Sequence, residues 1–469
     1  MTKRKVKVPH TLIVLFSMVI LAQVLTYIIP AGEFDRVEND QGRMQVVPGS
    51  FHRNHETPAL SPGAFLMAIP KGLSDAHAII LFVLIIGGTF AVLRYTGAMD
   101  TGMGSLLRHW GNKPFWLVAG GIIIFAAGSS TVGFGEEYYP FVPVLIGMTL
   151  VLGYDRLTAI AIIMIGYGVG YGAATINPFT TLIAQDIAGL EPSSGLWYRL
   201  VLFFVFVPIG IHHVWSYAKK VKRDPAASLV ADVSIPDGLS IPNRENAETM
   251  GNQASMTGKQ KLIMIALGSA MVLLIFGMGM WKWGLNEMQG VFVALTMIIA
   301  VIARISPNRV ATEFSIGAGS LTSVALLIGV ARGIQVVLSE GGVVDTMVHW
   351  LSIPVKILPG ALSAVGMFVV QSITNFFIPS GSGQAFVTMP IMAPLSDLVG
   401  VSRQVAVLAF QFGDGFSNIV IPTQYVLIGI LAMAGVPYDR WLRFIWPFMV
   451  KVGIAGSIAL AVAVLIGYT

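Results

Sequence analysis

The chain lacks cysteine, carries little charge and contains none of the short motifs that mark ATP-driven pumps or hydrolytic enzymes. The absence of cysteine among 469 residues excludes disulfides, thiolate metal sites and cysteine nucleophiles. Only 11% of the residues are charged, whereas a soluble domain usually carries about 25%. No Walker motif, zinc-protease helix or G-x-S-x-G is present, so we expect a protein that is not an enzyme and has no cofactor beyond a coupling ion.

Apolar sequence is abundant instead, with 55% hydrophobic residues and a mean hydropathy of +0.76. Runs such as Leu12–Ile29 and Leu262–Met280 approach the roughly 20 apolar residues that cross a bilayer as a helix. The sequence therefore predicts an all-α polytopic membrane protein whose surroundings are the lipid bilayer. We expect spanning or half-spanning segments near residues 11–30, 77–95, 114–131, 133–152, 156–188, 197–217, 260–280, 288–304, 320–338, 357–378, 382–399, 402–435 and 440–467.

The basic residues predict the topology. Lys3, Arg4, Lys5 and Lys7 precede the first apolar run, as they would in a signal peptide. That run is long for a signal peptide, and no clear small-x-small cleavage site follows it. We favour an uncleaved first helix with a cytoplasmic N-terminus, in a multi-pass protein of the bacterial inner membrane. The net charge of +5 is modest and lies in loops, so it indicates membrane orientation and not a nucleic-acid surface.

Two halves of the chain share residues at a constant offset. Six positions match six others 245 residues later: Gly88, Val92, Leu93, Gly97, Asp100 and Thr101 match Gly333, Val337, Leu338, Gly342, Asp345 and Thr346. Gly168 and Gly170 fall on Gly413 and Gly415 at the same offset. An offset that persists across some 80 residues favours a duplicated architecture over chance.

The charge distribution favours an inverted arrangement of the two repeats. We expect a first repeat over 1–217 with a re-entrant hairpin at 114–152, and a cytoplasmic linker over 218–260. An extra connecting helix over 261–287 would then turn over the second repeat, 288–469, which has a re-entrant hairpin at 357–399. This scheme has about 11 transmembrane helices plus the two hairpins. If the two hairpins cross the membrane fully, the number of spans and the inverted orientation of the repeats change.

A polar interruption in the second half is the first candidate site. It contains Asn375, Ser380, Gly381, Ser382, Gly383 and Gln384. Broken backbone within a bilayer is tolerated only where protein or a water-filled cavity satisfies its polar groups. Glycine permits a tight turn, and hydroxyls with a helix N-terminus suit a carboxylate. We predict a hairpin tip at a substrate site; a polar helix-packing motif is the alternative.

The corresponding region of the first half has the same character and adds two carboxylates. Its candidates are Ser129, Ser130, Thr131, Glu136 and Glu137. Charged residues within a membrane are costly and are usually functional. Adjacent residues on a helix do not share a face, so one glutamate is expected at the site and the other on backbone or a helix end. In the alternative, both glutamates lie at a wet boundary.

Glycine-rich segments in both halves lead into polar residues and a proline. In the first half, glycines from Gly166 to Gly172 precede Thr175 and Asn177; in the second, Gly413 and Gly415 precede Ser417, Asn418 and Thr423. Because glycine weakens helices, we predict unwound segments. Their oxygens suit a small cation or a substrate amine, and a packing kink is the alternative. The candidate sodium ligands are Gly170, Thr175, Asn177, Asp414 and Ser417, and the candidate substrate ligands include Asn177, Asp414, Asn418 and Thr423.

These motifs resemble the YfcC-like branch of the anaerobic C4-dicarboxylate carrier (DcuC-type) family. The likeness covers nearly the whole chain and is dense at the hairpins. It includes Pro30-Ala-Gly-Glu33, Gly133-Phe-Gly-Glu-Glu137, Gly153-Tyr-Asp155, Asn177-Pro-Phe179, the run Asn375 to Gln384, Met389-Pro390 and Phe410 to Asn418.

The resemblance implies the ion-transporter superfamily fold. It also implies a homodimer with a static scaffold domain and a mobile, elevator-type transport domain, and a carboxylate-bearing substrate coupled to Na⁺ or H⁺ or exchanged. Members of this branch carry the label of arginine/ornithine-type antiporters. Glu136, Glu137 and Asp414 favour a basic or neutral amino acid over a C4-dicarboxylate, because no lysine or arginine lies in the four interrupted segments. A channel and a membrane enzyme or receptor are the other classes of protein considered.

Overall fold

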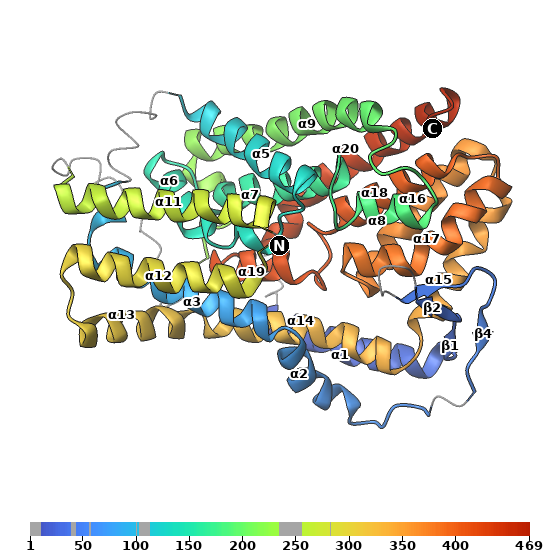
Figure 1. Ribbon diagram of the computed structural model, residues 1–469, viewed down its shortest axis with the longest axis horizontal. Helices are drawn as coiled ribbons and strands as arrows, with labels where there is room; N and C mark the ends of the chain where they lie inside the picture. Colours follow the sequence, from blue (N-terminus) through green and yellow to red (C-terminus); the bar gives the residue numbers. More distant parts are fainter. Residues whose placement is uncertain are drawn as a thin grey trace, which may run out of the picture.

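The computed structural model describes residues 11–38, 44–55, 58–99, 101–102, 113–233, 256–281 and 283–469. This part is mostly helical, and many helices run close to the long axis of the molecule (Figure 1). Among the described helices, seven are long and apolar enough to cross a membrane: His77–Tyr95, Pro114–Thr131, Leu196–Arg223, Leu285–Ala303, Thr322–Glu340, Gly360–Phe377 and Tyr438–Leu465. The prediction of a multi-pass helical membrane protein is confirmed at this level, while the expected 11 spans stay a prediction.

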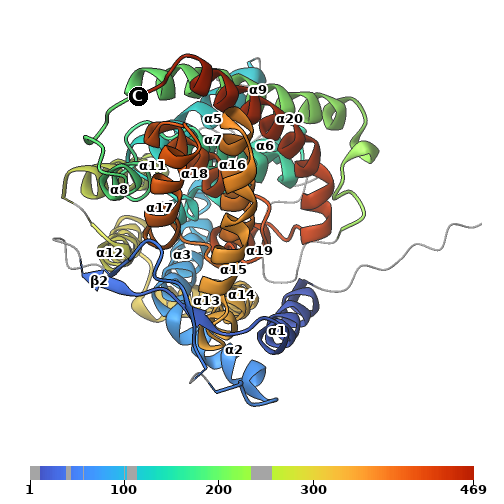
Figure 2. The ribbon, with the colours of Figure 1, turned by 90° about the vertical axis from the view of Figure 1, so that its right-hand side faces the viewer.

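The helices form two groups that lie one above the other in Figure 2. The first, which we call the crossing group, contains α1 (Thr11–Ile28), α2 (Ala64–Asp75), α3 (His77–Tyr95), α12 (Leu285–Ala303), α13 (Pro307–Ser320) and α14 (Thr322–Glu340). Helix α1 packs on α14 as α12 packs on α3, and α2 packs on α14 as α13 packs on α3. Each of these contacts joins a helix of the first half to a helix of the second, and the repeat relates the two contacts of each pair. Helix α11 (Gly258–Trp281) packs against α12.

Glycines set the closest approaches in the crossing group. A Cβ at Gly72 of α2 would lie 2.3 Å from the carbonyl oxygen of Gly329 in α14. A Cβ at Gly317 of α13 would lie 2.3 Å from the carbonyl oxygen of Gly87 in α3. Gly72 and Gly317 are related by the same offset of 245 residues that the sequence shows. Such small residues let membrane helices approach closely, and the pair of crossings makes this group a firm frame.

The second group, which we call the hairpin group, repeats one order of elements twice. The first set is α5 (Pro114–Thr131), α6 (Phe141–Val151), α7 (Arg156–Gly172), α8 (Thr181–Ile187) and α9 (Leu196–Arg223). The second set is α16 (Gly360–Phe377), α17 (Gly381–Leu398), α18 (Arg403–Ser417), α19 (Tyr425–Met433) and α20 (Tyr438–Leu465). Helix α5 packs on α7 as α16 packs on α18, and α9 and α20 are both 28 residues long.

Helices α7 and α18 form the centre of the hairpin group. All residues of α7 except Tyr171 are buried, as are all residues of α18 except Arg403. The two helices touch backbone to backbone, because a Cβ at Gly415 would lie 2.1 Å from the Gly172 nitrogen. A cavity lined by Ser320 and Ile146, among others, lies between the two groups, at the contact of α3, α6, α13 and α19.

One detail of the sequence-based scheme is wrong. Short β-ribbons depart from the all-α expectation: β1 (Gly32–Glu33) pairs with β4 (His52–Arg53), and β2 (Arg36–Glu38) pairs with β3 (Met44–Val46). Arg36 ties its ribbon to α15 (Val344–Ser352) by a two-pronged ion pair with Asp345, at 2.7 and 2.9 Å. Helix α9 continues to Arg223 and a 3₁₀ turn (Pro225–Ala227) follows, so the first residues of the expected linker over 218–260 are helical. Linker residues 234–255 lie outside the described part.

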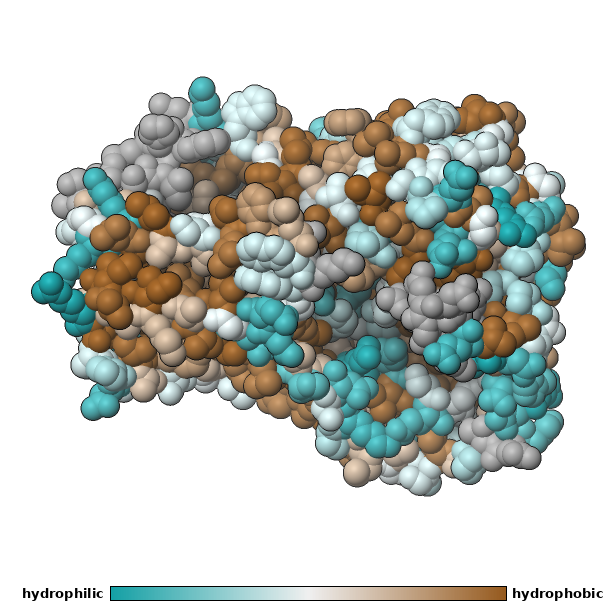
Figure 3. Space-filling view, viewed as in Figure 1, coloured by the Kyte–Doolittle hydropathy of each residue, from teal (hydrophilic) through white to brown (hydrophobic). Residues whose placement is uncertain are grey.

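Hydrophobic side chains cover the outer face formed by α11, α12 and α13, and hydrophilic ones lie towards both ends of α12 (Figure 3). Exposed large residues of these three helices include Phe276, Val293, Met297, Val301 and Ile316. An apolar band of this extent on a multi-pass protein is a surface for lipid or for another membrane protein.

Candidate functional site

The two helix pairs turn where the sequence interrupts its apolar runs. Helix α5 ends at Thr131, and the Gly128 carbonyl accepts from the N–H groups of Val132 and Gly133 at 2.9 and 3.1 Å. Gly133 has a φ of 84°, which favours glycine and lets the chain reverse towards α6. In the second pair, Ser380 caps α17, and its side chain accepts from the Gly383 N–H at 3.4 Å.

The expected unwinding of the glycine runs is wrong in its position. Helix α7 includes every glycine from Gly166 to Gly172, and α18 includes Gly413 and Gly415. The backbone loses helical structure only after these helices, over residues 173–180 and 418–424, which we call the first break and the second break. The glycines serve close packing: a Cβ at Gly170 would lie 2.5 Å from the Ala126 carbonyl oxygen. Their weak helix propensity is outweighed by tertiary contacts.

A hydrogen-bonded cluster joins the first pair to the first break. Ser130 Oγ lies 3.0 Å from Thr175 Oγ1, and the Thr175 N–H donates to Ser130 Oγ at 3.0 Å. Asn177 Nδ2 donates to the Ser129 carbonyl at 2.9 Å, while Asn177 Oδ1 accepts from the Phe179 N–H at 2.9 Å. Ser129 Oγ donates to the Phe134 carbonyl at 2.8 Å. The polar atoms of this cluster largely satisfy one another.

The second pair meets the second break through Asn375. Its Nδ2 lies 2.9 Å from the Asp414 carbonyl, and 2.7 Å from both Ser417 Oγ and Asn418 Oδ1. Gln424 Nε2 also donates to Asn418 Oδ1, at 2.9 Å. Asn375 contacts the second break as Ser130 contacts the first, and the two residues are separated by the offset of 245 residues.

Unlike the first cluster, the second leaves several buried oxygens without a hydrogen bond in the described structure. These atoms are Thr374 Oγ1, Asn375 Oδ1, Gln384 Oε1, Thr423 Oγ1 and both carboxylate oxygens of Asp414. The side chains of Asp414, Asn375, Thr374 and Gln384 are fully buried. Buried polar atoms are normally paired, and an unpaired group indicates an ion, water or ligand partner. The buried oxygens of the second cluster are therefore available to bind an ion, a water molecule or a ligand.

The tips and breaks converge around Asp414. A Cβ at Gly381, in the first turn of α17, would lie 3.2 Å from Asp414 Oδ2 and 2.4 Å from Thr180 Cγ2 of the first break. A Cβ at Gly133 would lie 2.9 Å from Asn177 Oδ1. Each tip thus lies against the first break, and the tip at Gly381 also lies against α18. Larger residues at Gly381 or Gly133 would separate these elements.

Glu136 and Glu137 follow the first tip and have different neighbours. Glu137 Oε2 accepts from the Gly135 N–H at 2.5 Å, which turns this carboxylate back onto its own loop. Glu136 Oε2 lies 3.5 Å from the hydroxyl of Tyr425, the first residue of α19. The rings of Tyr167 and Tyr171 of α7 lie tilted against each other near the same loop, with centroids 4.8 Å apart, and Tyr171 donates to the Gly133 carbonyl at 2.6 Å.

Some predicted residues take other roles. Thr131 is exposed, and its hydroxyl donates to the Ala127 carbonyl at 2.7 Å, within its own helix. Ser382 and Gly383 are half-buried in the first turn of α17, next to Gly381. Gln384 is fully buried and donates to Gln371 of α16, so it braces the pair of helices. The two halves meet where Gly381 lies against Thr180 and where Glu136 lies beside Tyr425, while the Thr131 hydroxyl bonds within its own helix.

Sequence reasoning missed Arg199, in the first turn of α9. Its side chain is only 1% exposed. One guanidinium nitrogen lies 3.3 Å from the Thr175 carbonyl in the first break, and the other lies 2.6 Å from the Ser194 carbonyl and 2.9 Å from Gln404 Oε1 of α18. The sequence carries no motif here, only a single arginine within an apolar run. Arg199 ties the first break to the start of α18.

Replacing Arg199 by lysine is expected to destabilise the protein by about 2 kcal/mol or more and to reduce transport. An ammonium group cannot reproduce the planar fork that reaches three acceptors, and each lost charged hydrogen bond costs about 1.5–3 kcal/mol. The thermal midpoint of the purified protein would report the loss. Arg403→Lys is the matched control, because Arg403 is 39% exposed. Equal midpoints for both variants would contradict this role.

Comparison with known proteins places the chain among membrane carriers. The model of the family described as C4-dicarboxylate anaerobic carrier matches residues 8–465. The chain is 32% identical to the Escherichia coli K12 protein named "Putative basic amino acid antiporter YfcC", over 99% of this chain and 98% of that protein. It is 28% identical to an uncharacterized protein of Haemophilus influenzae Rd, over 98% of each.

Among solved structures, the chain has a remote similarity to the YdaH transporter of Alcanivorax borkumensis. The identity is 14% and the TM-score is 0.42, over 98% of this chain and 99% of that chain.

Proposed function

The chain belongs to the C4-dicarboxylate anaerobic carrier family, and we propose that it is a secondary transporter that exchanges amino acids, of the arginine/ornithine type, across the bacterial inner membrane. One observation carries the choice of substrate. The three carboxylates near the convergence, Glu136, Glu137 and Asp414, form no ion pair with any described lysine or arginine. The 32% identical relative named as a basic amino acid antiporter supports the same substrate class.

The site offers both halves of a basic amino acid a partner. Glu136, beside the Tyr425 hydroxyl and the rings of Tyr167 and Tyr171, suits an ammonium or guanidinium group, since carboxylates and aromatic faces both attract cations. The first turn of α17, with its N–H group at Ser382, suits the substrate carboxylate. The substrate would then lie between the two tips.

A sodium ion fits the second cluster better than the first. Asp414, Asn375 and Thr374 supply buried oxygens without hydrogen bonds, and hard cations such as Na⁺ bind oxygen ligands. Thr175 and Asn177 already bond their neighbours, and Gly170 lies within a helix. We assign the coupling-ion role to the Asp414 cluster, with the proton as the alternative ion that Asp414 can carry.

A C4-dicarboxylate is the alternative substrate, and the description of the family favours it. Two anionic groups need two cationic partners or sodium ions. Arg199 bonds carbonyl and amide oxygens, and Arg332 bonds Gln335 and lies 3.9 Å from Asp75. A dicarboxylate would therefore depend on bound cations at the second cluster.

Competition binding separates the two substrate classes. Purified protein would be incubated with labelled arginine and with unlabelled arginine, ornithine, lysine, leucine or succinate, each with and without sodium. We expect arginine and ornithine to displace the label, leucine to do so weakly, and succinate not to compete. No specific binding of labelled arginine, together with saturable binding of labelled succinate, would assign the site to dicarboxylates.

We further propose that the hairpin group moves as an elevator against the crossing group, within a homodimer. The close glycine crossings of one group, and the nearly complete burial of α7 and α18 at the centre of the other, support this division. Because the chain has no cysteine, a cross-linker would react only with introduced thiols. Ile146→Cys and Ser320→Cys would place one thiol on each side of the cavity between the groups. A bis-maleimide that links them should stop exchange, while single-cysteine variants should continue. Full exchange by the cross-linked protein would contradict the movement.

A further inference from the structure

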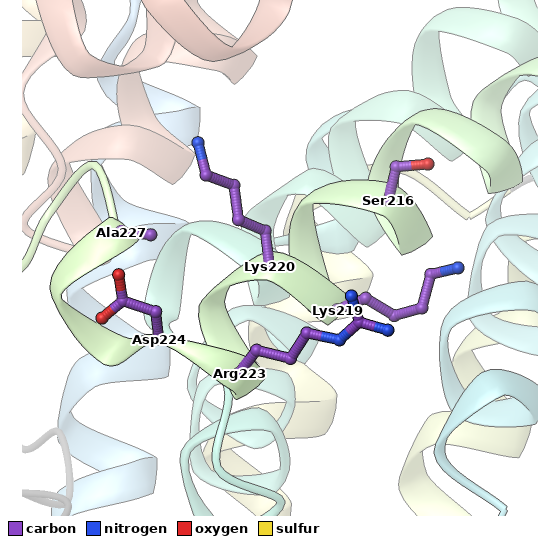
Figure 4. Close-up of a pocket in the computed structure, with 6 residues that line it drawn as sticks. All are labelled: Ser216, Lys219, Lys220, Arg223, Asp224 and Ala227. Atoms are coloured by element: carbon purple, nitrogen blue, oxygen red, sulfur yellow. The ribbon is translucent and has the colours of Figure 1, made fainter.

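A second site of a different chemistry lies at the C-terminal end of α9, far along that helix from Arg199. A cavity of about 350 Å³ is lined by Ser216, Lys219, Lys220, Arg223, Asp224 and Ala227 (Figure 4). Three of its lining residues are basic and one is acidic. None of the three basic residues forms an ion pair with a carboxylate of the described chain. The cavity thus carries an uncompensated positive charge.

The walls of this cavity are fixed by a buried carboxylate. Asp155 caps α7 and accepts from the Tyr217 hydroxyl at 2.5 Å and from the Ser228 hydroxyl at 2.6 Å. The Leu229 N–H donates to the Tyr217 hydroxyl at 3.1 Å. These bonds hold the turn after α9 against the bundle. Basic residues at a helix end are common in cytoplasmic loops, but here they surround a preformed hollow.

The position of the cavity along α9 matches the level of lipid headgroups. With 28 residues, α9 is about 42 Å long, whereas the hydrocarbon core of a bilayer is about 30 Å thick. About the first 20 residues, up to Trp215 and Ser216, therefore fill the hydrocarbon, and the last two turns stand outside it. Trp215 has the place of an interfacial aromatic residue, and the Lys219 ammonium lies 5.9 Å from its ring centroid.

The side chains present a two-pronged cation. Trp215, Lys219 and Arg223 follow one another at intervals of four residues, so they share one face of the helix. Lys219 and Arg223 extend in the same direction in Figure 4, and Lys220 extends to another side. Asp224, the acidic residue, accepts at Oδ1 from the Ala226 N–H at 3.0 Å. A guanidinium with a neighbouring ammonium suits a phosphate monoanion or diester.

We propose that this cavity binds the phosphate of an anionic phospholipid of the cytoplasmic leaflet. The headgroup lies between Lys219 and Arg223, and its acyl chains lie along the apolar face of α9 below Trp215, where Phe204, Val201 and Val205 are exposed. A lipid suits this place better than a soluble phosphate compound, because the hollow opens where the apolar face of the helix ends.

Native mass spectrometry of the full-length protein, titrated with phosphatidylglycerol and separately with phosphatidylcholine, tests this site. We compare the wild type, Lys219→Gln/Arg223→Gln, and the control Lys259→Gln/Lys261→Gln, which removes two charges from the exposed start of α11. Each basic residue near the surface contributes about 1 kcal/mol, so the pocket variant should bind phosphatidylglycerol roughly 30-fold more weakly. Equal binding by all three proteins would overturn the proposal.

Two further arms keep the result decisive. The charge-preserving Lys219→Arg/Arg223→Lys variant should retain phosphatidylglycerol binding, which separates loss of charge from loss of folding. Loss of binding in this variant, with its thermal midpoint unchanged, would overturn the role of charge. Inorganic phosphate and glycerol 3-phosphate are expected not to displace the lipid at equal concentration. If either does so, the site takes a soluble phosphate and the assignment to lipid is wrong.

Discussion

Asp414→Asn is expected to reduce coupled transport by about 10- to 100-fold while the protein still folds. Asparagine has nearly the same shape but lacks the negative charge that a bound cation needs. Interactions of ionised groups contribute about 1.5–3 kcal/mol, and 1.4 kcal/mol is a factor of ten. Both carboxylate oxygens of Asp414 are buried without a hydrogen bond, so the native fold gains little from them. Uptake into proteoliposomes, with and without a sodium gradient, measures the loss.

The control for Asp414 is Asp397→Asn, near the end of α17. Asp397 is 49% exposed and pairs with Arg403 at 2.8 Å, and an exposed pair contributes at most about 1 kcal/mol. Its loss should leave transport close to that of the wild type. If Asp414→Asn transports at the wild-type rate with the same ion dependence, the carboxylate holds no coupling ion. If it fails to fold, the carboxylate instead stabilises the junction between α17 and α18.

Glu136→Gln is expected to weaken binding of arginine by about 10- to 100-fold, while binding of a neutral amino acid changes by a few-fold at most. Glutamine keeps the size of the side chain and its contact with Tyr425, but it cannot pair with a guanidinium. Competition binding with arginine and leucine measures both effects. An equal loss of affinity for arginine and leucine would show that Glu136 supports the loop and does not bind the cationic group of the substrate.

Glu137→Gln is the comparison within the same loop. Glutamine can still accept from the Gly135 N–H, but the hydrogen bond loses its charge and weakens, so the thermal midpoint should fall slightly and all substrates should be affected alike. The opposite assignment, in which Glu137→Gln alone removes selectivity for basic amino acids, would exchange the roles of the two glutamates.

Long apolar helices and the positions of the turns could be predicted from the sequence. The segment expected at 77–95 is α3, and the hairpin expected at 357–399 contains α16 and α17 with a turn at Ser380. These features depend on local composition: runs of apolar residues, and small polar residues that interrupt them. The offset found in the sequence also relates elements of the structure, since α3 and α14 have the same length and begin 245 residues apart.

Features that depend on tertiary contacts could not be predicted in this way. Helix α2 lies in the mixed-charge stretch 31–75 and contains Pro70, and α13 is a polar helix that begins at Pro307. Their packing against α14 and α3 makes them part of the frame. The glycine runs of α7 remain helical because the neighbouring backbones replace the missing side chains. Arg199 has no sequence motif, and only its burial beside the first break indicates its role.

Counterflow in proteoliposomes tests the central claim most directly. Vesicles with purified protein are loaded with unlabelled arginine or ornithine, and a trace of labelled arginine is added outside, with and without a sodium gradient. We expect the label to accumulate above equilibrium only in the loaded vesicles, because exchange uses the outward flux of the unlabelled substrate. Saturable accumulation of this kind also excludes a channel. If labelled arginine does not accumulate, whereas labelled succinate accumulates in vesicles loaded with succinate, the protein is a dicarboxylate exchanger and the proposed amino-acid site is wrong.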